Sequence, residues 1–374
     1  PISINRLFLN GGSRGVHQLF TDALAEYEAD AAIPGRINKI DGDNLNTHPE
    51  YFKLAACRVL EDLGCSYRFH SQVTGVTKDG QSIQGVQVGG KRGIEEFFAH
   101  AIVDATGDAD VAFFAGADMV TGRETDGGLM FVSLCFALAN CDVEAFYASD
   151  GWRNTVSEAA CTGKYRMARW YGPNRTTIPG VIGINNGGPV DAGDIDATDA
   201  AALTLVERIG LEVALDFVRI ARDFQIPGLG ECHLMRTGAA AAVRETRRIV
   251  GDYVLTLEDC CEGVEFDDLV ARRYGAVDPA GADSTKGIEM VSGHSYPYRS
   301  MLPKGIEGLL VAGRCASTTH MGQTAGKSMG NMMDLGQAAG VAAALAARRR
   351  ITPRALEVSI IQKALVDMGV PLFP

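Results

Sequence analysis

Residues 101–110 read AIVDATGDAD, and this stretch decides the fold. A short apolar run leads directly into Thr106-Gly107 and an acidic pair, which predicts a buried strand that ends in a tight turn. In open α/β sheets the carboxyl ends of the strands line the ligand crevice, and glycine lets the backbone come close to a bound molecule. Residues 308–314, GLLVAGR, repeat this design near the C-terminus. The two stretches therefore predict an α/β protein that binds a ligand at the ends of buried strands.

The region before residue 101 changes from helical to strand-like periodicity. Apolar stripes predict helices over residues 16–28 and 49–63. The turn pairs Asp79-Gly80 and Gly89-Gly90 then separate short alternating runs, which predicts a β-meander. Its expected strands are residues 65–70, 73–77, 82–88 and 94–98.

The middle of the chain, from about residue 118 to 303, has a mixed pattern and contains most of the aromatic residues. It predicts a strand over residues 181–185 and a helix over residues 197–224. We interpret this region as one that covers a substrate. The last third returns to the α/β pattern, with a helix rich in small residues expected over residues 335–347.

Composition excludes several functional classes. The 374 residues carry a formal net charge of −11, which argues against a nucleic-acid surface, and no apolar run reaches the length of a membrane span. The nine cysteines include no C-x-x-C pair, so neither a metal site nor an iron–sulfur cluster held by this chain alone is expected. We interpret them as reduced thiols and predict a cytoplasmic protein.

Four blocks of sequence together resemble one family. The blocks are residues 104–110 (DATGDAD), 244–253 (RETRRIVGDY), Tyr298-Arg299 and Pro303 ahead of 310–315 (LVAGRC), and 336–340 (GQAAG). Their order and spacing resemble, from about residue 11 to the C-terminus, the FAD-dependent oxidoreductases of the glutathione-reductase-like superfamily, with a distant similarity to the flavin subunit of heterodisulfide reductase.

The resemblance implies a fold class and a division of the chain. We expect an α/β protein with a three-layer domain like those that bind FAD or NAD(P), carrying the β-meander and an inserted α+β substrate-covering domain. The FAD-binding part is expected at residues 1–123 and the substrate-covering domain at 124–295. Residues 296–374 then return to the FAD-binding domain and add the C-terminal helices.

The resemblance also implies a cofactor, FAD held non-covalently, and the residues that border it. The strand end is expected to contribute Ala105, Thr106, Gly107 and Asp108, and the second strand Gly313, Arg314 and Cys315 along the ribityl and pyrophosphate. The amino end of the last long helix, near Leu335, Gly336 and Gln337, is expected to point at the flavin pyrimidine edge. Free N–H groups at a helix start stabilise negative charge, as on a reduced flavin.

One departure from the family concerns the N-terminal region. The family opens with a βαβ unit that contains a G-x-G-x-x-G turn, and this chain has no such motif. Residues 11–15, GGSRG, match instead the loop that follows the unit and lies near the flavin. We expect a first βαβ unit of roughly forty residues to be missing upstream. Lys327 and Gly330 stand where the family would have Arg and Pro.

Three residues are candidates for catalysis. His320 is expected in a loop over the flavin ring, where it could take a proton as hydride leaves the substrate. Arg247 and Arg299, together with Arg248, could bind an acidic substrate or the flavin, because guanidinium groups suit carboxylates and phosphates. The alternatives are a loop histidine bonded to its own backbone and solvated or structural arginines.

The sequence therefore predicts a FAD-dependent oxidoreductase that transfers a hydride between a small organic substrate and flavin. One alternative is a non-catalytic or electron-transfer flavin subunit completed by a partner chain. Another is a flavin-dependent isomerase without net redox change. An electron-transfer partner or a homo-oligomer is compatible with each function.

Overall fold

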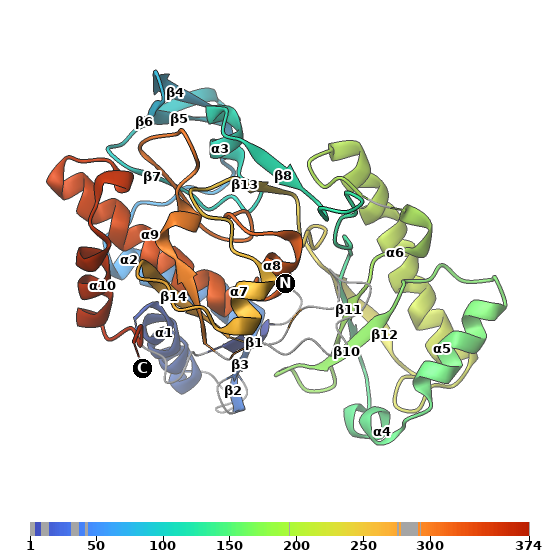
Figure 1. Cartoon of the computed structure of the whole chain (residues 1–374). Coiled ribbons are helices and arrows are strands. Elements are labelled where there is room, and N and C mark those ends of the chain that lie inside the picture. The colour runs from blue at the N-terminus through green and yellow to red at the C-terminus, as the bar shows by residue number, and fades with distance from the viewer. Residues whose placement is uncertain are drawn as a thin grey trace. The chain divides into compact units, whose positions relative to one another are not determined.

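The computed structural model describes residues 4–8, 15–30, 37–41, 44–193, 195–274, 277, 291 and 293–373. Contacts divide the chain into two compact units, which are described separately (Figure 1). The first unit comprises Pro1–Leu7, Ala23–Cys57 and Met130–Arg244, and the second comprises Phe8–Asp22, Arg58–Leu129 and Glu245–Pro374. This division assigns residues 245–295 to the second unit, whereas the expected domain boundary at 295/296 stays a prediction.

The first unit is built around a four-stranded antiparallel sheet with strand order β10-β11-β9-β12. A smaller sheet has the order β1-β3-β2. The predicted strand over residues 181–185 and helix over residues 197–224 are confirmed as β11 and α6. The elements are β1 (Ile4–Phe8), β2 (Asn38–Asp41), β3 (Asn44–Thr47), β9 (Phe136–Ala139), α4 (Val143–Ala148), α5 (Trp152–Cys161), β10 (Tyr171–Arg175), β11 (Ile182–Asn186), η1 (Val190–Ala192), α6 (Ala200–Asp223) and β12 (His233–Thr237).

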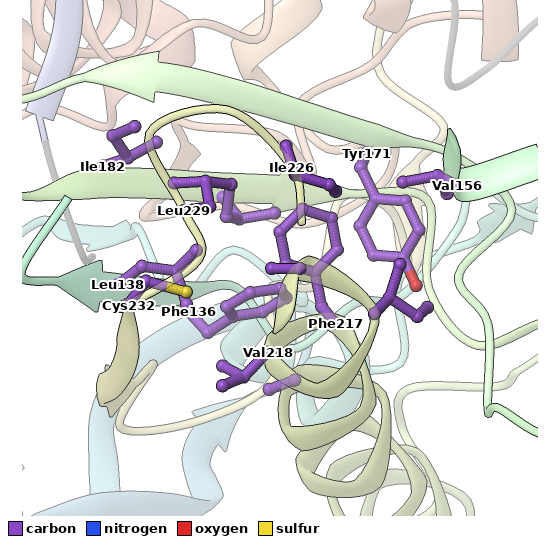
Figure 2. Packing of buried hydrophobic residues seen from close by; sticks show 14 of the residues in the cluster. Phe136, Leu138, Val156, Tyr171, Ile182, Phe217, Val218, Ile226, Leu229 and Cys232 are labelled. Carbon is purple, nitrogen blue, oxygen red and sulfur yellow. The ribbon is translucent and has the colours of Figure 1, made fainter. Parts of the chain in front are cut away.

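The core of this unit lies between α6 and the four-stranded sheet (Figure 2). Phe217 of α6 is completely buried, and its ring centroid lies 5.7 Å from that of Phe136 and 4.8 Å from that of Tyr171. The side chain of Asp199 caps the start of α6 by accepting a hydrogen bond from the Ala201 N–H. The apolar stripe predicted from the sequence is thus the face that packs on the sheet.

The β-meander is the first part of the second unit. It consists of β4 (Gln72–Asp79), β5 (Ser82–Gly90) and β6 (Gly93–Phe98), paired in that order, which confirms three of the four expected strands. The strand expected over residues 65–70 is wrong. Those residues are exposed, and the Cys65 N–H bonds to the Leu60 carbonyl at the end of α2 (Pro49–Asp62). The segment therefore terminates a helix instead of joining a sheet.

The two stretches that predicted ligand-facing strands lie side by side. Residues Ile102–Asp104 form β7 and Leu309–Val311 form β16, and the two strands are parallel. Their carboxyl ends consequently meet at the same edge. Helix α9 (Met329–Arg349) contacts both strands and also β14 (Leu269–Arg273) (Figure 1).

The start of α9 differs from the prediction. The helix begins at Met329, six residues before Leu335, so Leu335, Gly336 and Gln337 lie inside it and not at its amino end. Gly330 and Asn331 are weak helix formers, which hid the first turn from sequence reasoning. Tertiary contacts stabilise that turn, because the buried Asn331 side chain bonds to the backbone N–H and carbonyl of Tyr274 at 2.9 and 2.8 Å.

Short elements complete the second unit, and helix α1 (Val16–Asp30) spans its boundary. The predicted mixed α/β class is confirmed, while the three-layer arrangement stays a prediction. In the described segments, no helix is both long and apolar enough to cross a bilayer. The remaining elements are α3 (Asp110–Ala115), β8 (Met119–Thr121), β13 (Arg247–Ile249), α7 (Leu257–Glu262), β15 (His294–Pro297), η3 (Tyr298–Met301), α8 (His320–Thr324), η4 (Pro353–Ala355) and α10 (Val358–Asp367).

Candidate functional site at the carboxyl ends of β7 and β16

The turn after β7 is held by the last residue of the strand. Asp104 is completely buried, and its Oδ1 accepts hydrogen bonds from the Thr106 N–H at 3.1 Å and from the Thr106 hydroxyl at 2.7 Å. Its Oδ2 accepts from the Ala112 N–H at 3.0 Å. The carboxylate thereby links the turn to α3. Ala105 and Thr106 remain exposed at the tip.

The turn is joined to the end of β16 by an ion pair. Arg314 Nη2 lies 2.5 Å from Asp108 Oδ1. Gly107 has φ +82°, and a Cβ there would stand 2.8 Å from Arg314 Nη1. Only glycine meets both requirements, because a side chain would be strained and would displace the guanidinium. Four predicted site residues, Gly107, Asp108, Gly313 and Arg314, are thus brought to one edge.

The segment that leads into β13 adds to the same cluster. The Thr246 hydroxyl donates to Asp108 Oδ1 at 2.7 Å, and Arg247 Nε donates to the Asp108 carbonyl at 2.9 Å. Arg247 Nη2 also lies 2.5 Å from Asp110 Oδ1. Burial raises the pKa of Asp110, and the positive charge of Arg247 opposes that increase. The predicted site residue Arg247 therefore stabilises the turn by binding the Asp108 carbonyl and the Asp110 carboxylate.

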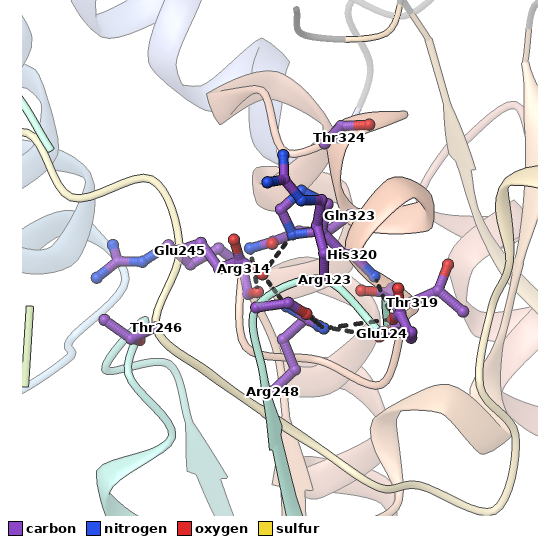
Figure 3. A network of polar contacts seen from close by, with 12 residues as sticks. Arg123, Glu124, Glu245, Thr246, Arg248, Arg314, Thr319, His320, Gln323 and Thr324 are labelled. Atoms are coloured by element: carbon purple, nitrogen blue, oxygen red, sulfur yellow. Dashed lines mark hydrogen bonds and ion pairs between the residues drawn. The ribbon is translucent and has the colours of Figure 1, made fainter. Parts of the chain in front are cut away.

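His320 is buried and belongs to a polar network next to this segment (Figure 3). Its Nδ1 lies 2.9 Å from Glu245 Oε1, and its backbone N–H donates to Glu124 Oε1 at 2.8 Å. Glu245 also pairs with Arg248, and both side chains are fully buried. Burial lowers the pKa of Arg248, whereas the charges of Glu245 and Glu124 oppose that shift. The Glu245 carboxylate thus fixes the His320 ring and balances a buried cation.

Cys315 follows Arg314 but points into the core. Its side chain is completely buried, and burial raises the pKa of the thiol to about 12. A thiol with such a pKa is protonated at neutral pH and is a poor nucleophile. This geometry supports a packing role for the Cys315 side chain.

Four other predicted site residues have different surroundings. Arg299 is engaged by Asp268, whose Oδ2 lies 2.9 Å from Arg299 Nε and whose Oδ1 lies 3.1 Å from Nη2. Gln337 Oε1 accepts from the Val16 N–H at 3.0 Å, so it holds the start of α1. Leu335 is buried in the core and Gly336 is exposed on α9. Residues 11–14 of the expected flavin loop lie outside the described residues.

Sequence reasoning missed the partners that organise the site. Glu245 and Thr246 were visible only as part of the resembling block at residues 244–253, whereas Arg248 was considered as a possible contact of an acidic substrate or the flavin. Gln323, whose Nε2 donates to the Arg314 carbonyl at 2.7 Å, carried no signal. In the described part of the chain, no three potential metal-binding side chains come together.

Comparisons with known proteins give a family match and several distant structural likenesses. Similar solved structures include the flavin-dependent brominase Bmp2 (13% identity, TM-score 0.46, covering 98% of this chain and 74% of that one). Another is a geranylgeranyl bacteriochlorophyll reductase-like protein from Thermoplasma acidophilum (12% identity, TM-score 0.43, covering 88% of this chain and 62% of that one). A third is the OxyS anhydrotetracycline hydroxylase from Streptomyces rimosus (14% identity, TM-score 0.37, covering 94% of this chain and 55% of that one). The chain thus spans about three fifths of the length of the last two.

The comparison with curated proteins finds no match. The family model described as FAD dependent oxidoreductase matches residues 6–365, which is nearly the whole chain and includes every segment of the site above. The chain therefore belongs to the FAD dependent oxidoreductase family.

Proposed function

We propose that this protein is an enzyme that transfers a hydride between a small organic substrate and FAD bound at the carboxyl ends of β7 and β16. The family match supplies the cofactor. One observation supports this location for the FAD site. The carboxyl ends of two parallel strands lie side by side at Gly107 and Gly313, and the ion pair between Arg314 and Asp108 joins them. Such an edge is where α/β sheets bind nucleotides.

Two features of this edge fit a flavin nucleotide. Gly313 has φ +105°, and no atom lies within 4 Å of the place that a Cβ would occupy, so the backbone is open to close approach. Arg314 Nε is buried and has no hydrogen-bond partner among the described residues. A guanidinium donor next to an open glycine suits a phosphate or another oxygen-rich group. Gly107, Gly313 and Arg314 would therefore hold the cofactor.

Bound FAD would supply the hydride acceptor or donor, and the protein would supply position and proton transfer. His320 would take the proton that accompanies loss of hydride from the substrate. Glu245 holds Nδ1 of the ring and so fixes its orientation, as the orienting carboxylate does in other acid–base pairs. Arg247 would act through the turn, because its partners are Asp108 and Asp110.

The first test is whether the purified chain binds FAD. We expect a flavin-type visible absorption band, either as isolated or after addition of FAD, and bleaching of that band when a hydride-donating substrate is added without oxygen. Gly313→Ala should weaken FAD binding, because the new methyl group would occupy the open space beside the backbone.

Gly305→Ala is the matched control for this substitution. Gly305 also has positive φ and open surroundings, but it lies before β16, away from the carboxyl edge. The control should carry similar backbone strain and retain FAD. A colourless protein that gains no flavin absorbance with FAD would contradict the proposal, as would equal loss of FAD in both variants.

A further inference from the structure

Two adjacent arginines at the end of β14 have opposite surroundings. Arg272 pairs with Glu265, with Nη1 lying 2.5 Å from Oε1, and it also donates to the carbonyls of Gly293 and Leu372. Arg273 points to the other face of the strand and is 2% exposed. Its Nε and Nη1 have no hydrogen-bond partner within the described residues. One arginine is therefore neutralised, and the other is a buried cation without a counter-charge from those residues.

The face that carries Arg273 gathers further unpartnered groups. In the antiparallel register, Arg273 lies opposite His294, and Ala271 lies opposite Tyr296. All four side chains therefore share one face. His294 Nε2 and the Tyr296 hydroxyl are buried, and neither has a hydrogen-bond partner in the described part of the chain. The Arg273 Cζ atom lies 5.1 Å from the centroid of the Tyr296 ring.

On the opposite face of the same two strands, the polar side chains have hydrogen-bond partners. There Glu265 accepts hydrogen bonds from Arg272 and from the Ser295 hydroxyl, the latter at 3.0 Å. The contrast is local, because the two faces belong to the same two strands. The unpartnered groups around Arg273 are thus a property of that face and not of the whole hairpin.

Arg273 also lies close to the backbone that connects α8 to α9. A Cβ on Gly326 would overlap Arg273 Nε, so the guanidinium lies directly against the backbone three residues before the helix begins. The next residue, Tyr274, bonds to Asn331 in the first turn of the helix. The amino end of a helix carries partial positive charge, which disfavours an unpaired cation and favours an anion.

The charge around Arg273 sets the charge of a suitable ligand. Burial and the neighbouring Arg273 lower the pKa of His294 to about 4, so the imidazole is neutral at neutral pH. Burial raises the pKa of Tyr296, so the phenol keeps its proton. The face therefore offers one full positive charge and one hydroxyl donor. A single negative charge with two acceptor oxygens complements it, because burying an unpaired ion is strongly unfavourable.

We propose that Arg273 and Tyr296, beside Gly326 and the start of α9, form a buried binding site for the carboxylate group of a small organic anion. The guanidinium and the phenol donate to the carboxylate oxygens, and the neutral His294 leaves the charge balanced. This site contains none of the residues proposed to hold FAD at the ends of β7 and β16, and it shares with the expected flavin contacts only the start of α9. It therefore extends beyond the proposed function.

The test is the melting temperature of the full chain while sodium acetate is titrated into a low-salt buffer at neutral pH. We expect a rise of roughly a few degrees at saturation, because a ligand that binds only the folded state stabilises it. Arg273→Met should abolish the rise. Without acetate this variant should melt at or above the wild-type temperature, because the unpaired buried cation has been removed.

Two further variants keep the test informative. Arg272→Met should melt lower under all conditions, because it loses its Glu265 pair, and should retain the response to acetate. Gly326→Ala keeps the charge but displaces the guanidinium, so acetate affinity should fall roughly tenfold or more.

Three results would overturn the proposal: no response to acetate in the wild type, an equal response in Arg273→Met, or an Arg273-dependent response to phosphate or FAD but not to acetate. Flavin absorbance is recorded separately on the same samples. A failure of FAD binding is therefore distinguishable from a failure of this site.

Discussion

At the scale of single residues, the site depends on carboxylates that each serve several partners. Asp104 folds its own turn, Asp108 joins Arg314 to Thr246, and Glu245 serves both His320 and Arg248. Asp104 and Glu245 lie in the low-dielectric interior, where a shared carboxylate is worth more than an exposed one and its loss leaves buried partners unpaired.

Substitution of Glu245 tests this dependence. We expect Glu245→Gln to lower the free energy of unfolding by about 3–5 kcal/mol, because the buried Arg248 would lose its closest counter-charge. Urea denaturation measures the change. Asp367→Asn removes an exposed partner of Lys363 in the same unit and should leave stability close to wild type. Equal effects of the two substitutions would show that Arg248 does not depend on Glu245.

At the scale of elements, the hairpin of β14 and β15 concentrates buried ionisable groups. Arg273, His294 and Tyr296 share one face. Burial lowers the pKa of Arg273 and of His294 and raises the pKa of Tyr296, so it favours the neutral form of each side chain. Helix α9 is fixed to this hairpin through Asn331. The protonation of His294 is therefore coupled to the stability of the second unit.

The coupling predicts a pH dependence with a definite sign. The folded-state pKa of His294 is about 4 and the unfolded value is about 6.5, so between these pH values the unfolded chain binds a proton that the folded chain does not. Stability should therefore fall as the pH decreases through this window, by an amount on the order of 2–3 kcal/mol.

Denaturation of wild type and His294→Asn from pH 7 to pH 4 measures this contribution. The variant should lose less stability over the window, because it has no imidazole to protonate. His100→Asn removes an exposed histidine in the same unit and should retain the wild-type slope. Parallel curves for wild type and His294→Asn would contradict the assignment.

At the scale of the whole molecule, each of the two units has its own hydrophobic core. The first is centred on Phe217 between α6 and the four-stranded sheet, and the second includes Leu310 of β16. Both side chains are fully buried. Separate cores imply that damage to one should act mainly on its own unit.

Matched cavity substitutions test this independence. Phe217→Ala should cost about 3–5 kcal/mol and Leu310→Ala about 2–5 kcal/mol in the unit concerned. Amide hydrogen exchange should show lost protection mainly in residues 130–244 for the first variant and in residues 245–374 for the second. Loss of protection throughout the chain in both variants would show that the two units unfold together.

The sequence alone determined the mixed α/β class, three strands of the meander, the two strands that end in glycine turns and the resemblance to FAD-dependent oxidoreductases. These features are local, because periodicity and turn residues act over a few positions. Residues 65–70 alternate like a strand but pair with no strand among the described residues, and the first turn of α9 is stabilised by Tyr274, 57 positions away. Neither fact is visible in a local pattern.

The partners of the site were decided by the tertiary structure. Glu245 meets His320 across 75 positions, and Arg314 meets Asp108 across 206. The adjacent Arg272 and Arg273 look equivalent in the sequence. Because side chains alternate between the two faces of a strand, Arg272 pairs with Glu265 and Arg273 is buried. Charge and residue type can be read along a chain. Burial and pairing arise only when distant segments pack, and they determine what each charge can bind.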